Sequence, residues 1–306
     1  MQYTLEMHVR KALLTAAGFG TRFLPITKTI QKEMLPILER PLIDYTVSDC
    51  VAAGIEEIIF VISEHNQQLL HFYRENLRLK KYLESMNKIE LYGRVDHLHE
   101  QVKMTFIRQP DDRMYGTAVP LQLAEKQLHD EAAFFVFLGD DCMYSPDGSS
   151  EAVRMLSAFH QAHVCGLATC IEVPRKEVSR YGVCAPKIGP NGEQLLAHMV
   201  EKPTVEAAPS NLINISKYIL PPDVFEILRT QAPDSQSGEL YITDTVTTLA
   251  QSKPVLMYQP QGTYLDGGNP LNWLKANLTV AWNNPEYRTA LKQLVQHLDQ
   301  NKLTTA

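Results

Sequence analysis

The sequence has few cysteines, no long apolar run and no excess of positive charge. Its five cysteines are odd in number and none forms a C-x-x-C pair, so a disulfide framework and a zinc ribbon are both poorly supported. No run approaches the ~20 apolar residues of a membrane span, and the first residues, MQYTLEMHVR, lack the apolar stretch of a signal peptide. We therefore expect a soluble, cytoplasmic protein with reduced thiols and no membrane partner.

The charge balance argues against a nucleic-acid partner. The 306 residues carry 29 Lys and Arg against 35 Asp and Glu, a formal charge of −6, whereas a nucleic-acid binder usually presents a basic face. A small anionic ligand needs only a local cluster of cations, which Arg22, Lys28 and Lys32 could form. Hydrophobic residues make up 44% of the chain, which is enough to form a full α/β core.

Short apolar runs alternate with amphipathic segments up to about residue 140. This alternation is typical of βαβ units and a parallel sheet covered on both faces. Ligands of such sheets lie outside the carboxyl ends of the strands, where AAGFG, IRQ and LGDD all fall. Strands are predicted over 11–17, 56–63, 102–109 and 132–141, helices over 41–55 and 117–130, and a long helix or a pair of helices over 66–89.

The pattern changes beyond about residue 150. After a helix with a serine cap, four strands follow without long helices between them, which suggests a mixed or antiparallel extension of the sheet. Two helices, a further strand and a helical C-terminal stretch from residue 270 complete the pattern. No repeat or linker interrupts the chain, so a single domain over 1–306 is predicted.

The segment after the first strand, GFGTRFLPITKTIQKEMLPI, contains half of a dinucleotide fingerprint. Phe23 stands where the third glycine would be. Pro25 and Pro36 exclude the uninterrupted helix that a Rossmann dehydrogenase has there, so a long loop is predicted. Its glycines let the backbone approach phosphate oxygens, and Arg22 and Lys32 supply positive charge. The segment therefore suits a triphosphate.

A series of motifs runs through the chain in a fixed order. AAGFGTRFLP…K…KEMLPILERPLIDY is followed by GTAVP, FLGDD, RYGVC, VEKP, PSNLINISKYIL, GELYITD and YLDGGN. The series resembles the sugar-1-phosphate nucleotidylyltransferase family over most of the chain, and its KEMLP form is most similar to the bacterial UTP–glucose-1-phosphate uridylyltransferases. The resemblance implies an α/β fold of the nucleotide-diphospho-sugar transferase type, with a Rossmann-like, mixed but mostly parallel central sheet flanked by helices.

The same resemblance implies Mg²⁺-dependent transfer of a uridylyl group from UTP to glucose 1-phosphate, which gives UDP-glucose and pyrophosphate. It implies a nucleotide-binding part over 10–145, a sugar-binding part over 146–269 and C-terminal helices over 270–306. Relatives often form dimers or tetramers, so a homodimer or homotetramer is expected. Arg22 and Lys32 would stabilise the departing phosphates.

Three aspartates are candidates for the chemistry. Asp140 and Asp141 end an apolar strand, where an acid is costly unless it is solvated, paired or bound to a metal. Asp266 precedes two glycines in YLDGGN. Mg²⁺ in nucleotide sites is usually held by one or two carboxylates and substrate phosphates. The resemblance implies Asp140 and Asp266 as its ligands, and we expect Asp141 to be a turn or helix-cap acid.

A polar side chain that ends a strand can read a base. The amide of Gln109 has both a donor and an acceptor, as a uracil edge requires. The resemblance gives Gln109 this role and assigns the rest of the nucleotide contacts to Ala16, Ala17, Gly18, Gly20 and Gly116.

The motif MVEKP carries the predicted sugar-phosphate contacts. By resemblance, Glu201 contacts the glucose hydroxyls and Lys202 the sugar phosphate. Adjacent residues on a strand point to opposite faces, so the two side chains are expected to diverge. Gly182 would let the sugar pack against bare backbone, and Asn214 is a further candidate at the sugar site.

Departures from the family pattern keep alternatives open. Gln31 and Gly139 stand where proline is usual, and GELYITD differs from the commoner DEIQLTD. None of these three departures removes a predicted catalytic side chain. The open alternatives are a thymidylyltransferase or another hexose-1-phosphate nucleotidylyltransferase, a catalytically silent regulatory paralogue and, less well supported by the glycine pattern, a Rossmann dehydrogenase.

Overall fold

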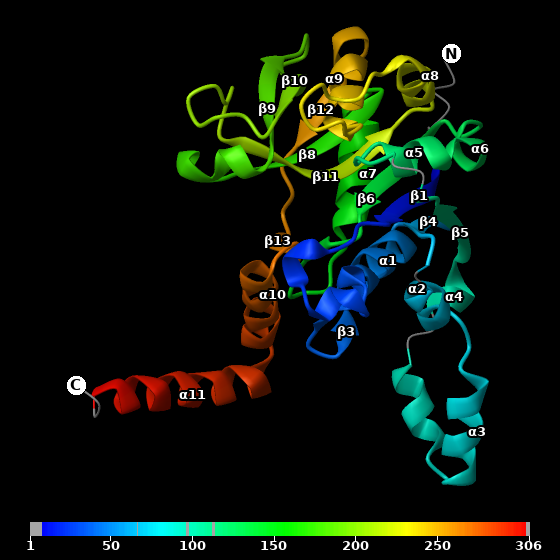
Figure 1. The fold of residues 1–306 in the computed structure, drawn as a ribbon, viewed down its shortest axis with the longest axis vertical. Helices are drawn as coiled ribbons and strands as arrows, with labels where there is room; N and C mark the ends of the chain where they lie inside the picture. Colours follow the sequence, from blue (N-terminus) through cyan, green and yellow to red (C-terminus); the bar gives the residue numbers. More distant parts are fainter. Residues whose placement is uncertain (1–7, 66, 96–97, 112–113, 304–306) are drawn as a thin grey trace. The chain divides into compact units, whose positions relative to one another are not determined.

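The computed structural model describes residues 8–303 except 66, 96–97 and 112–113 (Figure 1). The chain divides into two compact units, and each is assembled from three separate segments. The first unit comprises Met1–Gly18, Val47–Gly139 and Ser150–Gln261, and the second comprises Phe19–Thr46, Asp140–Ser149 and Gly262–Ala306.

A mixed nine-stranded sheet, in the order β5-β4-β1-β6-β11-β8-β12-β10-β9, forms the centre of the first unit (Figure 1). Strands β5, β4, β1 and β6 are parallel to one another, whereas β11 is antiparallel to both β6 and β8. This confirms the predicted parallel first half and its mixed extension. The strands are β1 (Val9–Ala16), β4 (Glu57–Ser63), β5 (Lys103–Gln109), β6 (Ala133–Leu138), β8 (Gly166–Glu172), β9 (Gly182–Ile188), β10 (Gln194–Glu201), β11 (Leu212–Leu220) and β12 (Val255–Tyr258).

Helices connect and cover these strands. The long helical segment predicted over 66–89 is two helices, and the one predicted over 117–130 is also broken into two short helices. The predicted serine cap is present, because Ser150 Oγ accepts a hydrogen bond of 3.1 Å from Val153 N. The helices are α1 (Leu42–Ala52), which begins in the second unit, α2 (Gln68–Phe72), α3 (Leu77–Ser85), η4 (Ile89–Arg94), α4 (Leu98–Gln101), α5 (Val119–Leu123), α6 (Glu125–Leu128), α7 (Glu151–Ala162), η5 (Arg175–Arg180), α8 (Asp223–Thr230) and α9 (Ile242–Ser252).

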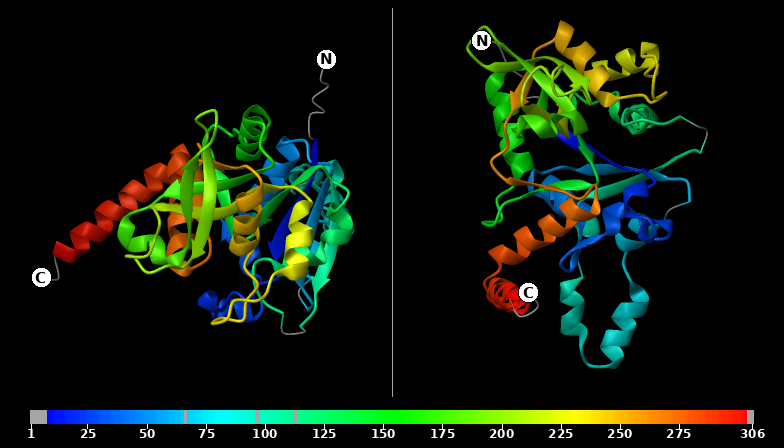
Figure 2. Two further views of the ribbon diagram at one scale, coloured as in Figure 1. Left: turned by 90° about the horizontal axis from the view of Figure 1, so that it is seen from above. Right: turned by 60° about the vertical axis from the view of Figure 1, so that its left-hand side comes forward.

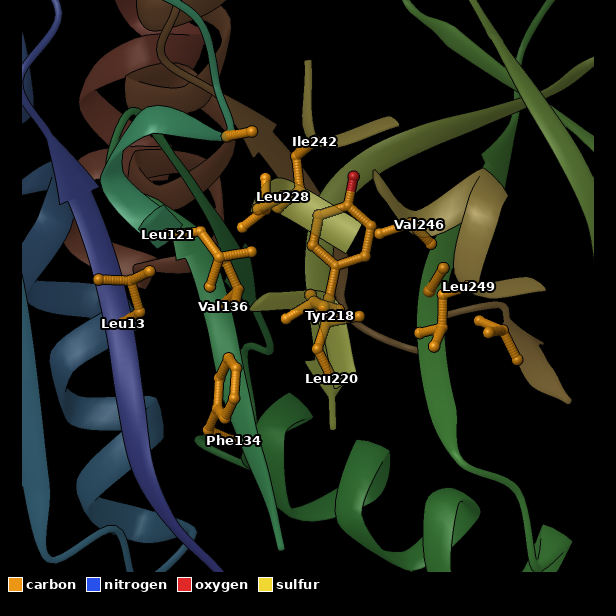
Figure 3. Packing of buried hydrophobic residues seen from close by; sticks show 14 of the residues in the cluster. Leu13, Leu121, Phe134, Val136, Tyr218, Leu220, Leu228, Ile242, Val246 and Leu249 are labelled. Atoms are coloured by element: carbon orange, nitrogen blue, oxygen red, sulfur yellow. The ribbon is translucent and has the colours of Figure 1, made fainter. Parts of the chain in front are cut away.

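The main hydrophobic core lies where α5, α8 and α9 pack on one face of the sheet (Figure 3). Strand residues such as Leu13, Val136 and Tyr218 meet helix residues such as Leu121 and Val246 there. Residues at the alternate strand positions are equally buried, including Leu14, Phe135 and Phe137. Both faces of these strands are therefore covered, as expected for parallel strands.

The helical hairpin of α3 and η4 stands away from the sheet of its own unit (Figure 2). Asn76 caps α3 by accepting a hydrogen bond of 3.0 Å from Leu79 N, and its backbone N–H donates to the hydroxyl of Tyr92. Leu77, Tyr82 and several other large apolar side chains on this hairpin remain exposed.

The second unit is built on two short antiparallel strand pairs and two C-terminal helices. Leu42, Cys142 and Leu265 are among the buried residues of its own small core. The loop predicted after β1 contains only single 3₁₀ turns, as its prolines require. The elements are η1 (Thr21–Phe23), η2 (Ile26–Lys28), η3 (Lys32–Met34), β2 (Pro36–Ile37), β3 (Arg40–Pro41), β7 (Asp141–Tyr144), β13 (Thr263–Asp266), α10 (Pro270–Asn283) and α11 (Pro285–Leu303).

All five cysteines are free, as expected, and four of them are buried. Burial raises the pKa of the Cys170 thiol to about 12, so it is unreactive near neutral pH. Among the helices that the structure describes, none combines the length and the hydropathy that crossing a bilayer would require.

Candidate functional site

Strands β1 and β5 end at the same edge of the sheet, because both are parallel to β4. Ala16 is the last residue of β1, and Gln109 is the last residue of β5. The Gln109 Nε2 donates weakly, at 3.5 Å, to Met114 O. Its Oε1 is buried and has no hydrogen-bond partner among the described residues. An acceptor left in this state suits a ligand N–H group, although the role of Gln109 stays a prediction.

Gly116 lies in a turn that is bonded tightly to the segment before α9. Leu240 N donates to Tyr115 O at 2.8 Å, and Ala118 N donates to Leu240 O at 2.9 Å. Gly116 has a φ of 128°, and a β-carbon built on it would lie 2.2 Å from Leu240 O. Glycine is therefore required here by the fold itself, before any nucleotide is considered.

Gly182, Glu201 and Asn214 come together in the first unit at the start of β9. Gly182 pairs with Glu201 across the sheet. A β-carbon on Gly182 would lie 3.1 Å from Glu201 Oε2, 3.0 Å from Thr243 Cγ2 and 3.9 Å from Asn214 Cβ. A side chain at this position would crowd Glu201 and Thr243, so the close approach of these residues favours glycine, and the packing of a sugar here stays a prediction.

The side chain of Asn214 makes hydrogen bonds within β11. It is buried, its Oδ1 accepts a hydrogen bond of 3.0 Å from Ser216 N, and its Nδ2 donates to the hydroxyl of Tyr218. Ser216 has a φ of 54°, where β11 slips in register against β8. Asn214 therefore holds a bulge of β11, and a sugar contact by its side chain stays a prediction.

The expected divergence of Glu201 and Lys202 is wrong. Strand β10 ends at Glu201, and Lys202 has a φ of 42° in the left-handed region. The alternation of a strand therefore does not extend to Lys202. Its Nζ lies 3.4 Å from Glu201 Oε1 and 5.5 Å from the centre of the Tyr241 ring.

In the second unit, the loop after Gly20 folds back on itself. Gly20 has a φ of 63°, and its carbonyl accepts a hydrogen bond of 2.7 Å from Thr27 Oγ1. A β-carbon on Gly20 would lie 2.9 Å from Thr27 Cγ2 and 3.4 Å from Lys32 Cβ. The glycine thus allows the loop to bring Lys32 next to its own first turn.

Lys32 forms an ion pair with Asp140, with Nζ 2.6 Å from Oδ2. Burial alone would lower the pKa of Lys32, but the neighbouring carboxylates of Asp140 and Glu33 raise it above its ordinary value. Lys32 is therefore charged at any physiological pH. Glu33 is buried, and this burial raises its own pKa to about 7.

Asp266 lies beside Asp140 in this unit. A β-carbon on Gly268 would lie 2.9 Å from Asp266 Oδ1, 3.7 Å from Asp140 Oδ2 and 3.7 Å from Arg22 Nη1. Both carboxylates and the guanidinium thus surround one glycine. Asp266 is held by Gly268 N, which donates to Oδ1 at 2.7 Å, and by the side-chain amide of Asn272, which donates to Oδ2.

The expectation for Asp141 is wrong. Asp141 is neither a turn acid nor a helix cap: it begins β7, is buried, and lies opposite Asp266 in the β7–β13 ladder. The hydroxyl of Tyr264 donates to its Oδ2 at 3.1 Å. Burial and the charge of Asp141 raise the pKa of this tyrosine well above its ordinary value, so the hydroxyl remains a donor.

The donor set of Asp140 and Asp266 fits Mg²⁺. Asp140 Oδ2 and Asp266 Oδ1 are hard oxygen ligands, and both lie near Gly268. Within the described ranges, no group of three or more His, Cys, Asp or Glu side chains could hold a metal. A metal here would have two protein carboxylates and would leave its other positions to phosphate oxygens and water, which is the usual Mg²⁺ arrangement in nucleotide sites.

Several residues that support the site were not predicted from the sequence. Tyr241 contacts Lys202, and Thr243 contacts Glu201. Asn272 donates a hydrogen bond to Asp266. One signal was available, because Asn-Pro at the start of α10 marks a helix cap and places residue 272 in the first turn after Asp266. The contacts of Tyr241 had no such signal.

The predicted residues fall into two groups by unit. The first unit holds Ala16, Ala17, Gly18, Gln109, Gly116, Gly182, Glu201, Lys202 and Asn214. The second unit holds Gly20, Arg22, Lys32, Asp140 and Asp266. Each group is assembled from segments that are distant in the sequence.

Comparison with known proteins identifies the family. The family model for nucleotidyl transferases matches residues 11–282. The UTP–glucose-1-phosphate uridylyltransferase of Streptococcus pneumoniae is 35% identical over 293 residues, which are 95% of this chain and 96% of the relative.

Two solved structures are similar over nearly the whole chain. A UTP-bound UGPase from Acinetobacter baumannii has a TM-score of 0.83 at 32% identity and covers 95% of this chain and 100% of its own. A UDP-glucose pyrophosphorylase complexed with UDP-glucose has a TM-score of 0.78 at 34% identity, with 90% and 100% covered. The predicted fold type is thereby confirmed, and the chain belongs to the nucleotidyl transferase family.

Proposed function

We propose that the protein transfers the uridylyl group of UTP to glucose 1-phosphate, giving UDP-glucose and pyrophosphate, with Mg²⁺ as cofactor. The observation that carries the proposal is the cluster around Gly268, where Asp140, Asp266 and Arg22 meet and Lys32 contacts Asp140. Such a cluster of two carboxylates and two cations suits a nucleoside triphosphate with its metal. The similarity to enzymes named for this reaction supports it.

The reaction requires no nucleophilic side chain. An oxygen of glucose 1-phosphate attacks the α-phosphorus of UTP in line, the bond to the β-phosphate oxygen breaks, and pyrophosphate leaves. A phosphate monoester is already anionic near pH 7, so no general base is required. Catalysis then rests on positioning two anions and on screening their repulsion.

Each charged side chain has a role in this scheme. Arg22 and Lys32 would stabilise the negative charge that develops on the departing pyrophosphate, and Lys202 would bind the phosphate of the attacking sugar. Asp140 and Asp266 would hold Mg²⁺, which neutralises phosphate charge when bound. The buried Oε1 of Gln109 would accept the N–H of the uracil ring.

Glu201 would bind the glucose hydroxyls. Its Oε2 accepts a hydrogen bond of 3.2 Å from Thr243 Oγ1, and the carboxylate keeps further lone pairs that a sugar hydroxyl could donate to. The five free cysteines are consistent with a cytoplasmic enzyme, and we assign the protein to that compartment.

We also propose that the protein forms a homodimer or homotetramer through α10 and α11. Leu278, Trp282 and Val295 line an apolar hollow between these helices, and all three are about half exposed. Covering such a surface is favourable by roughly 25 cal/mol per Å². Light scattering on the purified protein should give two or four copies, and Trp282→Glu should lower that number; a monomeric wild type would refute this assembly.

The test of the function is a substrate panel scored by pyrophosphate release. UTP, dTTP, ATP and GTP are each combined with glucose 1-phosphate and with other hexose 1-phosphates, with Mg²⁺ and with EDTA. Highest turnover with UTP and glucose 1-phosphate, abolished by EDTA, is expected. Thymine presents the same polar edge as uracil, so preference for dTTP would instead identify a thymidylyltransferase. A folded protein without turnover on any pair would indicate a silent paralogue.

A further inference from the structure

Lys202 is a flexible side chain in a constrained backbone position. Its φ of 42° and the hydrogen bond of 3.1 Å from its N–H to Tyr181 O fix the main chain. The side chain is half exposed, at 50%. A lysine of this kind loses rotamer entropy when it binds a phosphate, unless neighbouring groups already restrict it.

The start of α9 supplies that restriction. The ring of Tyr241, the residue before α9, lies 5.5 Å from Lys202 Nζ, within the range of a cation–π contact. Two residues later, Thr243 Oγ1 donates to Glu201 Oε2 at 3.2 Å. The beginning of one helix therefore contacts both members of the adjacent Glu201–Lys202 pair.

The same segment is fixed at its other side to the turn that carries Gly116. The backbone of Leu240 bonds to residues on both sides of this glycine, Tyr115 and Ala118, and Ile242 N donates to Thr117 Oγ1 at 3.0 Å. Residues 240–243 thus join the proposed nucleotide turn directly to the proposed sugar-phosphate residues. All of these contacts lie inside the first unit.

We propose that residues 240–243 set the spacing of the two substrate subsites, and that Tyr241 is a positioning residue for Lys202. This inference rests on the proposed function. The Tyr241 ring holds the ammonium group near Glu201 before the sugar phosphate arrives.

Steady-state kinetics with both substrates test the inference. Tyr241→Gln should raise KM for glucose 1-phosphate about threefold, the change expected for a cation–π contact of roughly 0.5–1 kcal/mol, and should leave KM for UTP unchanged. Tyr241→Phe keeps the ring and should behave as the wild type. Tyr82→Gln, which alters an exposed tyrosine on α3, is the matched control and should change neither constant. If Tyr241→Gln fails to fold, Tyr241→Leu replaces it.

A second measurement shows whether Tyr241 acts through Lys202. Tyr241→Gln should lower the affinity for UDP-glucose, measured by calorimetry, in the wild-type background and should have no further effect on it in a Lys202→Met background. An effect that persists in this background, an equal rise of both KM values, or a loss in Tyr241→Phe as large as in Tyr241→Gln would each overturn the inference. Absence of turnover in the wild type would instead refute the proposed function, so the two failures are distinguishable.

Discussion

Lys32 Nζ and Asp140 Oδ2 lie 2.6 Å apart, although 108 positions separate them in the sequence. The pair joins the loop after β1 to the turn before β7, within the second unit. The cation that we assign to the phosphates and the carboxylate that we assign to the metal are thus direct neighbours. Because an ammonium group has three N–H donors, Lys32 can contact a phosphate oxygen while it keeps this ion pair.

Replacing Lys32 tests its role in stabilising the leaving group. Lys32→Met should lower kcat on the order of 100-fold, because a positioned charge that faces the developing negative charge is lost. Lys32→Arg keeps the charge but not the compact ammonium group, and it should recover part of the activity. Pyrophosphate release at saturating substrates measures both. A Lys32→Met enzyme with wild-type kcat would contradict the assignment.

The adjacent aspartates provide a matched pair for the metal assignment. Asp140→Asn should reduce turnover on the order of 100-fold and raise the Mg²⁺ concentration at half-maximal rate, because one carboxylate is lost from the proposed donor pair. Asp141→Asn should retain turnover and instead lower stability by about 1 kcal/mol, because its hydrogen bond from Tyr264 loses its charge. Magnesium titrations and urea denaturation separate these effects. Equal loss of turnover in both variants would argue against the assignment.

The raised pKa of Glu33 should make the free energy of unfolding depend on pH. The buried carboxyl has a pKa of about 7 in the folded protein, raised mainly by burial from an ordinary value near 4.5. The folded state therefore holds the proton more tightly, so the stability gained from the neutral form is present below pH 4.5 and is lost as pH rises through 7. The loss is on the order of 3 kcal/mol.

Glu33→Gln removes this titration and should therefore stabilise the substrate-free protein at pH 8 more than at pH 5. Urea denaturation of both proteins from pH 5 to 8 in EDTA gives the difference. Parallel curves for the two proteins across this range would show that Glu33 does not change its protonation on folding.

Gly116 should not tolerate a side chain, whereas Gly54 should tolerate one. Both have a positive φ, of 128° and 76° respectively, but a β-carbon on Gly116 would overlap the backbone of Leu240, and one on Gly54 would meet nothing within 4 Å. Gly54→Ala should therefore cost about 1 kcal/mol of strain, and Gly116→Ala about 3 kcal/mol or more. Urea denaturation measures both. Similar losses would show that the contact with Leu240 relaxes freely.

Much of the fold follows from local pattern. The alternation of apolar and amphipathic runs predicted the parallel strands, and Pro25 and Pro36 predicted the loop after β1. These features depend on the backbone of the residues concerned, so a short stretch of sequence determines them. The opposed directions expected for Glu201 and Lys202 were wrong, because the residue at which a strand ends depends on its neighbours in the sheet.

By itself, the sequence determined the family, the order of the elements and the chemical types of the site residues, because motifs record residue type and spacing. Only the tertiary structure decided the partners: Lys32 with Asp140, Tyr264 with Asp141, and Tyr241 with Lys202. Contacts between distant segments arise when each unit folds. A side chain's neighbours are therefore a property of packing, which no local pattern contains.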